Sequence, residues 1–103
     1  MDTFGDIIRK LREEKRLPLR IVAGVLDTDQ AIISKIERGQ RRASKEQVIK
    51  LAEYFDMDKE ILMVAWLSDK IAYELIDEEF AGKALKVAEQ KIGYLKSNAS
   101  ANH

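Results

Sequence analysis

The residues of this sequence that could do chemistry lie on one predicted helix between residues 27 and 39. Asp29 is a good helix N-cap, because its carboxylate can accept from the free N–H groups of the first turn. Gly39 suits the left-handed conformation that follows a helix C-terminus. Ile33 and Ile36, three residues apart, face inward. The outer face then carries short polar side chains and cations: Gln30, Ala31, Ser34, Lys35 and Arg38.

That outer face is of a kind that can approach nucleic acid, because it includes no acidic side chain. Glutamine bonds base edges or phosphate, and lysine and arginine bond guanine or phosphate. A solvated surface helix is the alternative interpretation. The residues of this segment alone leave both interpretations open.

No set of residues for catalysis or metal binding is present. The chain has no Cys, and its one His, His103, is the last residue. Neither a Gly-rich phosphate loop nor a cluster with metal-ligand spacing occurs. The acidic run at 77–79 is better explained as a helix cap with first-turn acids than as a cation site. We therefore expect no enzymatic activity, no metal and no cofactor.

Composition indicates an all-α protein. The 103 residues suffice for one domain with a modest core, and they include one Pro, five Gly and few β-branched alternations. The longest apolar run, residues 61–67, is far too short to span a bilayer. The start of the chain lacks the pattern of a signal peptide. We expect a soluble cytoplasmic protein without a membrane partner.

Charge is unevenly distributed although the net charge is zero. Residues 1–55 carry a net charge of +3 and residues 56–103 carry −3. Residues 35–50 hold six cations against two anions. Phosphate binding depends on such a local patch and not on the global sum. The charge distribution is therefore compatible with a nucleic-acid partner.

Apolar spacing, caps and breakers predict six helices. We expect them over residues 3–15, 19–26, 30–38, 45–55, 58–76 and 77–96. Ser44 with Gln47 predicts a capping box, and Asp27 stands at a turn position that often needs positive φ. Residues 61–67 are apolar on every face, so we expect burial on more than one side. We expect a domain over 1–63, a C-terminal extension over 64–96 and a flexible tail over 97–103.

Several motifs in the first five predicted helices resemble the lambda-repressor-like (Cro-type, xenobiotic-response-element) helix-turn-helix family. The most specific is Ser34-Lys35-Ile36-Glu37-Arg38-Gly39. The other matching residues are Phe4-Gly5, Ile8-Arg9, Leu11-Arg12, Leu17, Leu19-Arg20, Val22-Ala23, Leu26, Arg41, Ser44 and Leu51-Ala52. The resemblance implies that the third helix enters the major groove of double-stranded DNA. Residues 62–67 and 84–89 also look like small controller regulators found beside restriction–modification genes.

The resemblance implies roles for individual residues. Those expected to read bases are Gln30, Ala31, Ile32, Ser34 and Lys35. Those expected to bind phosphates are Arg38, Gln40, Arg41 and Arg42. Leu19 stands where relatives carry a polar phosphate contact, and Arg20, one place on, can substitute. Arg12 and Glu37 match the positions of a structural ion pair in relatives.

The expected function is sequence-specific transcriptional regulation by a homodimer on a pseudo-palindromic operator, because one helix-turn-helix covers only a half-site. The apolar C-terminal helices offer the dimer surface. Its candidate residues are Met63, Trp66, Leu67, Ile71 and Phe80. Burial in the core of the same chain is the alternative for Met63, Trp66 and Leu67. The alternative function is an antitoxin-like or other interaction module whose C-terminal helices bind a partner protein.

Overall fold

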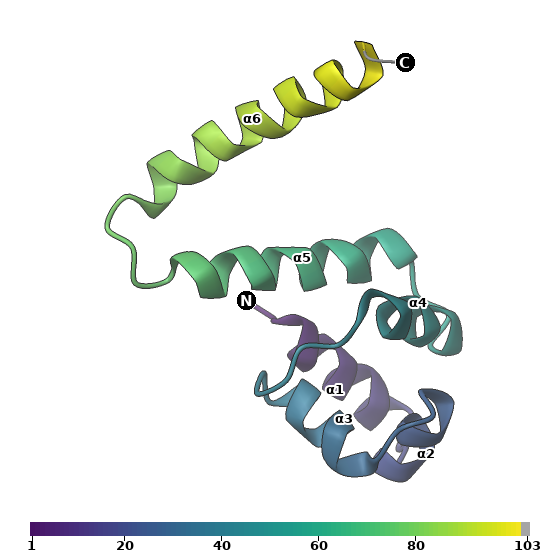
Figure 1. Cartoon of the computed structure of the whole chain (residues 1–103). Helices are drawn as coiled ribbons and strands as arrows, with labels where there is room; N and C mark the ends of the chain where they lie inside the picture. Colours follow the sequence, from purple (N-terminus) through teal and green to yellow (C-terminus); the bar gives the residue numbers. More distant parts are fainter. Residues whose placement is uncertain (102–103) are drawn as a thin grey trace. The chain divides into compact units, whose positions relative to one another are not determined.

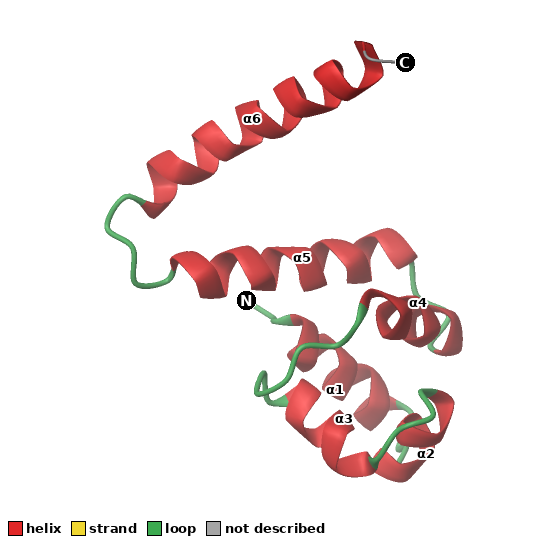
Figure 2. Cartoon of the chain, in the orientation of Figure 1, coloured by secondary structure: helices red, strands yellow, loops and turns green. Residues whose placement is uncertain are grey.

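The computed structural model describes the backbone of residues 1–101 and the side chains of residues 1–99. Every regular element in this range is a helix, which confirms the all-α prediction (Figure 1; Figure 2). The helices are α1 (Phe4–Glu14), α2 (Leu19–Val25), α3 (Gln30–Glu37), α4 (Lys45–Tyr54), α5 (Lys59–Leu75) and α6 (Ala81–Ala101). The chain forms two compact units, Met1–Ile71 and the residues from Ala72 on.

Two helices of the first unit begin with capping boxes. In α1, Thr3 Oγ1 accepts from the Asp6 N–H at 3.1 Å, and Asp6 Oδ2 accepts from the Thr3 N–H at 3.1 Å. Ser44 and Gln47 make the same exchange before α4, at 3.1 and 2.9 Å. The reciprocal bonds satisfy N–H groups that have no partner inside the helix. The box predicted at Ser44 is confirmed.

Each of the first four helices is followed, two positions after its last residue, by a residue at positive φ. These residues are Arg16, Asp27, Gly39 and Asp56, with φ of 53°, 55°, 74° and 51°. The N–H of the following residue reaches back to a helix carbonyl; after α3, Gln40 N donates to Lys35 O at 2.8 Å. This pattern satisfies the free carbonyls of the last turn. Positive φ was predicted from the residue type at Asp27 and at Gly39. It was not predicted at Arg16 or Asp56.

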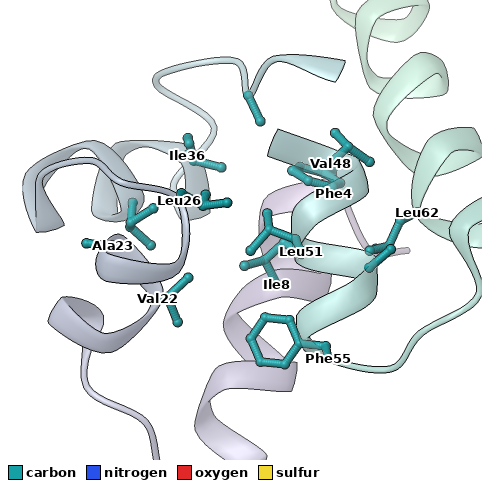
Figure 3. Close-up of a cluster of buried hydrophobic side chains, with 13 residues drawn as sticks. Phe4, Ile8, Val22, Ala23, Leu26, Ile36, Val48, Leu51, Phe55 and Leu62 are labelled. Atoms are coloured by element: carbon teal, nitrogen blue, oxygen red, sulfur yellow. The ribbon is translucent and has the colours of Figure 1, made fainter. Parts of the chain in front are cut away.

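A single apolar core holds the first unit together (Figure 3). α3 packs against α1 and α2, and α2 packs against α4. The buried apolar residues of this core are Phe4, Ile8, Val22, Ala23, Leu26, Ile33, Ile36, Ala43, Val48, Leu51, Ala52, Phe55 and Leu62. Ile33 and Ile36 face inward as predicted, so the opposite side of α3 faces outward.

Gly5 allows α1 to approach the C-terminal end of α3 at backbone distance. A Cβ built on Gly5 would lie 2.5 Å from the carbonyl oxygen of Ile36 and 2.6 Å from that of Glu37. Real Cβ atoms essentially never come so close to backbone atoms. The close approach of α1 and α3 at this point therefore requires a residue without a side chain.

One face of α5 packs on the core and the other is exposed. Leu62 is fully buried, and Met63 and Trp66 are half-buried against the core. Ile61, Val64, Leu67 and Ile71 are exposed. The expectation that residues 61–67 are buried on more than one side is wrong for the single chain, because only one face of α5 meets the first unit.

The docked part of α5 extends past the predicted boundary at residue 63. Asp69 Oδ2 accepts from the Phe4 N–H at 2.8 Å, which ties α5 to the N-terminus of α1. The compact unit consequently runs to Ile71. Among the described residues, no helix combines the length and apolarity needed to cross a membrane.

The second unit contains the end of α5, a turn and α6. Residues 77–79 lie in this turn, with Glu78 N donating to Leu75 O at 2.9 Å. α6 begins only at Ala81, with its first bond from Ala84 N to Phe80 O, so the expected cap at Asp77 is wrong. α6 continues to Ala101 instead of ending near Lys96, because no Gly or Pro follows Gly93 to stop it. The remainder of the predicted tail, residues 102–103, lies outside the described residues.

Candidate nucleic-acid interface

The turn between α2 and α3 sets the orientation of α3. Asp27 takes positive φ and reverses the chain after Leu26. Thr28 N donates to Ala23 O at 2.9 Å, which ends α2. Asp29 Oδ1 then accepts from the Ala31 N–H at 3.0 Å and caps α3. These local bonds form a helix-turn-helix whose second helix is held from behind by the core.

The five residues expected to read bases differ in accessibility. Gln30, Ala31 and Lys35 are exposed on the outer face of α3. Ser34 is half-buried. Ile32 is half-buried and packs against the core, so its side chain is less available to a thymine methyl group than the resemblance implies. The fully exposed residues of this face therefore offer one amide, one methyl group and one cation.

Four of the five residues expected to bind phosphates are exposed, one on α2 and three just after α3. Arg20 is exposed in the first turn of α2. Arg38, Gln40 and Arg41 are exposed where α3 ends and the next loop begins. Arg38 also donates from Nε to the carbonyl oxygen of Ser34 at 3.3 Å. Cations therefore flank α3 on two separate elements, as an extended phosphate backbone requires.

Arg42, the fifth residue expected to bind phosphate, is engaged within the chain. Its guanidinium carbon lies 4.0 Å from the centre of the Trp66 ring. Arg42 Nη1 also donates to the Trp66 carbonyl oxygen at 2.9 Å. Its charge remains at the surface, but the side chain is stacked on α5.

An ion pair joins α1 to the C-terminal end of α3. Arg12 donates from Nε and Nη2 to the two carboxylate oxygens of Glu37, at 2.7 and 2.9 Å. Glu37 is only 6% exposed. Arg12 Nη1 reaches the Leu17 carbonyl oxygen at 2.9 Å. The hydrogen bonds to Glu37 raise the pKa of Arg12 above its ordinary value. The pair therefore braces the end of α3 against α1, and the Glu37 side chain is buried and does not lie on the outer face of α3.

The residues expected at a dimer surface fall into two groups. Met63 and Trp66 pack against the core of their own chain, as the alternative interpretation held. Leu67, Ile71 and Phe80 are exposed, at 49%, 44% and 65%. The contacts by which Trp66 and Asp69 dock α5 were not predicted from the sequence, although the spacing 62–66–69 places both residues on the face of Leu62.

No metal centre is evident in the part of the chain that the structure describes. Three or more acidic or histidine side chains do not gather there in a way that could hold an ion. The described side chains also leave no buried polar atom without a hydrogen-bond partner. The exposed face of α3 with its flanking cations is therefore the candidate site.

The fold and this face define a helix-turn-helix protein. The helix-turn-helix family model matches residues 8–62, and the chain belongs to this family, of the lambda-repressor-like (Cro/C1) type. It is similar to the HTH-type transcriptional repressor RghR of Bacillus subtilis (strain 168), with 41% identity over 64 residues. The match covers 61% of this chain and 47% of that relative, so it spans about half the relative's length. No solved structure matches the chain.

Family membership confirms the resemblance drawn from Ser34-Lys35-Ile36-Glu37-Arg38-Gly39. The matched range ends within α5, just at the buried Leu62. The family is a class of DNA-binding proteins and not of enzymes, which agrees with the expectation from the sequence. The rest of α5 and the whole of α6 lie beyond the matched range.

Proposed function

We propose that this protein is a transcriptional repressor that binds a specific DNA sequence as a homodimer. The observation that carries the proposal is the outward face of α3, where Gln30, Ala31 and Lys35 stand exposed on a helix fixed from behind. A helix of this motif lies in the major groove with its N-terminal residues at the base edges. The similarity to a transcriptional repressor supports the direction of regulation.

Base reading and backbone binding fall to different residues in this proposal. Gln30 and Lys35 offer hydrogen bonds to base edges, and Ala31 offers a methyl contact. Ser34 and Ile32 lie at the margin of the same face. Phosphates are bound by the exposed residues Arg20, Arg38, Gln40 and Arg41, which set the register of the helix on the duplex. Their contribution is independent of sequence and falls as salt rises.

The exposed face of α5 supports the dimer. Val64, Leu67 and Ile71 lie opposite the face that docks on the core, and Ile61 lies beside them. Contiguous apolar surface of this kind commonly marks an interaction site. Leu67 and Ile71 were expected at the interface from the sequence, and Val64 and Ile61 extend the same stripe. Phe80, exposed in the second unit, is a further candidate.

Charge along α5 fits a two-fold contact with a second copy. In an antiparallel pairing centred between residues 65 and 66, Val64 meets the partner's Leu67, and Ile61 lies within one residue of the partner's Ile71. The same register brings Glu60 near the partner's Lys70. Opposite charges thus meet at both ends of an apolar contact, as a self-complementary two-fold interface requires.

The proposed operator symmetry and compartment follow from a DNA target, and the proposed target genes follow from the resemblance to known regulators. A dimer reads two half-sites about 34 Å apart, which makes the operator pseudo-palindromic. The likeness of residues 62–67 and 84–89 to regulators beside restriction–modification genes makes such genes the candidate targets. A DNA target makes the cytoplasm the expected compartment.

Selection of bound duplexes from a random pool tests the DNA-binding part. We expect a two-fold symmetric sequence, bound at least about 1000-fold more tightly than random DNA. Absence of enrichment with a folded protein would contradict the proposal. It would favour the alternative, an interaction module that binds a partner protein through its C-terminal helices.

Light scattering tests the dimer. We expect wild-type protein to be dimeric at about 50 µM, a concentration at which even an interface of modest affinity is occupied. Ile71→Lys should give a monomer. Tyr73→Lys is the matched control, because Tyr73 is similarly exposed but lies on the other side of α5. A monomeric wild type, or equal effects of the two substitutions, contradicts the proposed interface.

A further inference from the structure

Three contacts fasten the loop that follows α3 to the middle of α5. The Arg42 guanidinium stacks on the Trp66 ring at 4.0 Å. Arg42 Nη1 donates to the Trp66 carbonyl oxygen at 2.9 Å. Trp66 Nε1 donates to the carbonyl oxygen of Ala43 at 2.8 Å. The side chain and the backbone carbonyl of Trp66 thus hold two adjacent loop residues, Arg42 and Ala43.

We infer that Trp66 is a positioning residue for DNA binding, and that Arg42 acts through Trp66 rather than on a phosphate. This inference rests on the proposed DNA-binding function. A guanidinium that bridges a ring face and a carbonyl is committed to both, because its planar fork fixes the donor directions. The charge of Arg42 is therefore used to hold the loop.

Backbone bonds hold only the start of the loop, where Gln40 N and Arg41 N donate to Lys35 O at 2.8 and 3.3 Å. Gln40 and Arg41, its proposed phosphate contacts, are exposed, and Gly39 before them lies at positive φ. Ala43 is buried at 3% exposure and anchors the far end of the loop. The Trp66 hydrogen bond to Ala43 and the Arg42 stack set the path of the chain between these two points. Phosphate contacts lose affinity when their donors are free to move.

The same arrangement links the DNA-binding loop to the proposed dimer helix. Trp66 lies on the docked face of α5, and Leu67 lies on the exposed face one residue further on. Whatever orients α5 therefore also orients the loop that carries Gln40 and Arg41. The family match ends at residue 62, four residues before this side chain.

Acrylamide quenching of the protein without DNA tests the contact itself. Trp66 is the one tryptophan in the chain, so its emission reports this site alone. Arg42→Ala should raise quenching, because it uncovers one face of the indole. Arg20→Ala, an exposed arginine on α2, should leave quenching unchanged. Equal quenching in wild type and Arg42→Ala shows that the stack is absent, and it overturns the inference whatever the protein does with DNA.

A double-mutant cycle on the selected duplex tests the role. Arg42→Ala should weaken binding about 3- to 10-fold, the scale of a lost cation–π contact and hydrogen bond. In the Trp66→Leu background, Arg42→Ala should add less than about twofold, because the two residues act as one unit. Arg20→Ala should keep its full effect in that background. Circular dichroism confirms that each variant is folded.

The possible outcomes separate the two proposals. Additive effects of Arg42→Ala and Trp66→Leu show that Arg42 meets the DNA directly, and they overturn the inference. Trp66→Phe provides a second variant, which keeps an aromatic face and loses the donor to Ala43. It should fall between wild type and Trp66→Leu in affinity. A wild type that binds no duplex, while Arg42→Ala still changes quenching, overturns the DNA-binding proposal and leaves the stack in place.

Discussion

Substitution of Gly5 by alanine tests how α3 is held against α1. The added Cβ would lie 2.5 Å from Ile36 O, 2.6 Å from Glu37 O and 2.9 Å from the Glu37 carbonyl carbon. All three atoms belong to the backbone of the end of α3 and cannot rotate away. The two helices must therefore separate, or α1 must shift along α3.

The magnitude follows from two opposing effects. Overpacking of this kind costs about 1–3 kcal/mol, and a rigid backbone neighbour places the cost in the upper part of that range. Replacement of glycine by alanine in a helix recovers up to about 1 kcal/mol. We expect Gly5→Ala to lower the free energy of unfolding by a net value of about 1–2 kcal/mol.

Gly24→Ala is the matched control, because nothing lies within 4 Å of a Cβ at that position in α2. It should raise stability by about 0.5–1 kcal/mol. Urea unfolding followed by Trp66 emission is the suitable assay, because this tryptophan lies in the first unit and does not report α6. If Gly5→Ala is as stable as Gly24→Ala, the backbone contact between α1 and α3 is not as described.

Three further predictions concern the bonds that hold the first unit. Arg12→Ala should cost about 3–5 kcal/mol in thermal unfolding by stranding Glu37, and much of that loss should be absent when both residues are replaced by Met and Leu. Ser44→Ala should cost about 1 kcal/mol in urea unfolding, and full stability would refute the capping box. Hydrogen bonds from Thr3, chiefly its backbone N–H, lower the pKa of Asp6 below 3.8. Its stabilising effect is therefore present above that pH and lost below it, so the stability difference between wild type and Asp6→Asn should shrink on acidification below about pH 4.

The sequence predicted the first four helices well because their limits are set by local chemistry. Ser44 with Gln47 and the carboxylate of Asp29 each bond N–H groups within three residues. Gly39 satisfies the end of α3 by its own conformation. Apolar spacing then predicts the inner face of α3, since only one stripe can face a core.

The faces of α5 were not predictable by the same means. Residues 61–67 are apolar all round, so periodicity does not say which side docks. The face of α5 that docks is set by contacts with residues distant in sequence. These are Arg42 and Ala43 in the loop after α3, and the N-terminus of α1, which Asp69 caps. Contacts over such separations leave no periodic signal in a single sequence.

The start of α6 was predicted wrongly because turns and helix caps use the same residue types. An acidic run after an apolar helix is typical of a cap with first-turn acids. In the structure the run forms the turn itself, and the Phe80 carbonyl accepts the first bond of α6. Turn and cap signals share Asp and Glu, and composition alone does not separate them.

The central claim is that the outer face of α3 reads DNA bases while its flanks bind the backbone. The direct measurement is the binding free energy of wild type, Lys35→Ala and Arg41→Ala on every single-base-pair variant of the selected operator. We predict that Lys35→Ala relaxes one position of each half-site by about 1–3 kcal/mol. Arg41→Ala should weaken all variants equally and reduce the salt slope by about 1. A uniform loss with Lys35→Ala, or a loss confined to one position with Arg41→Ala, would contradict the claim.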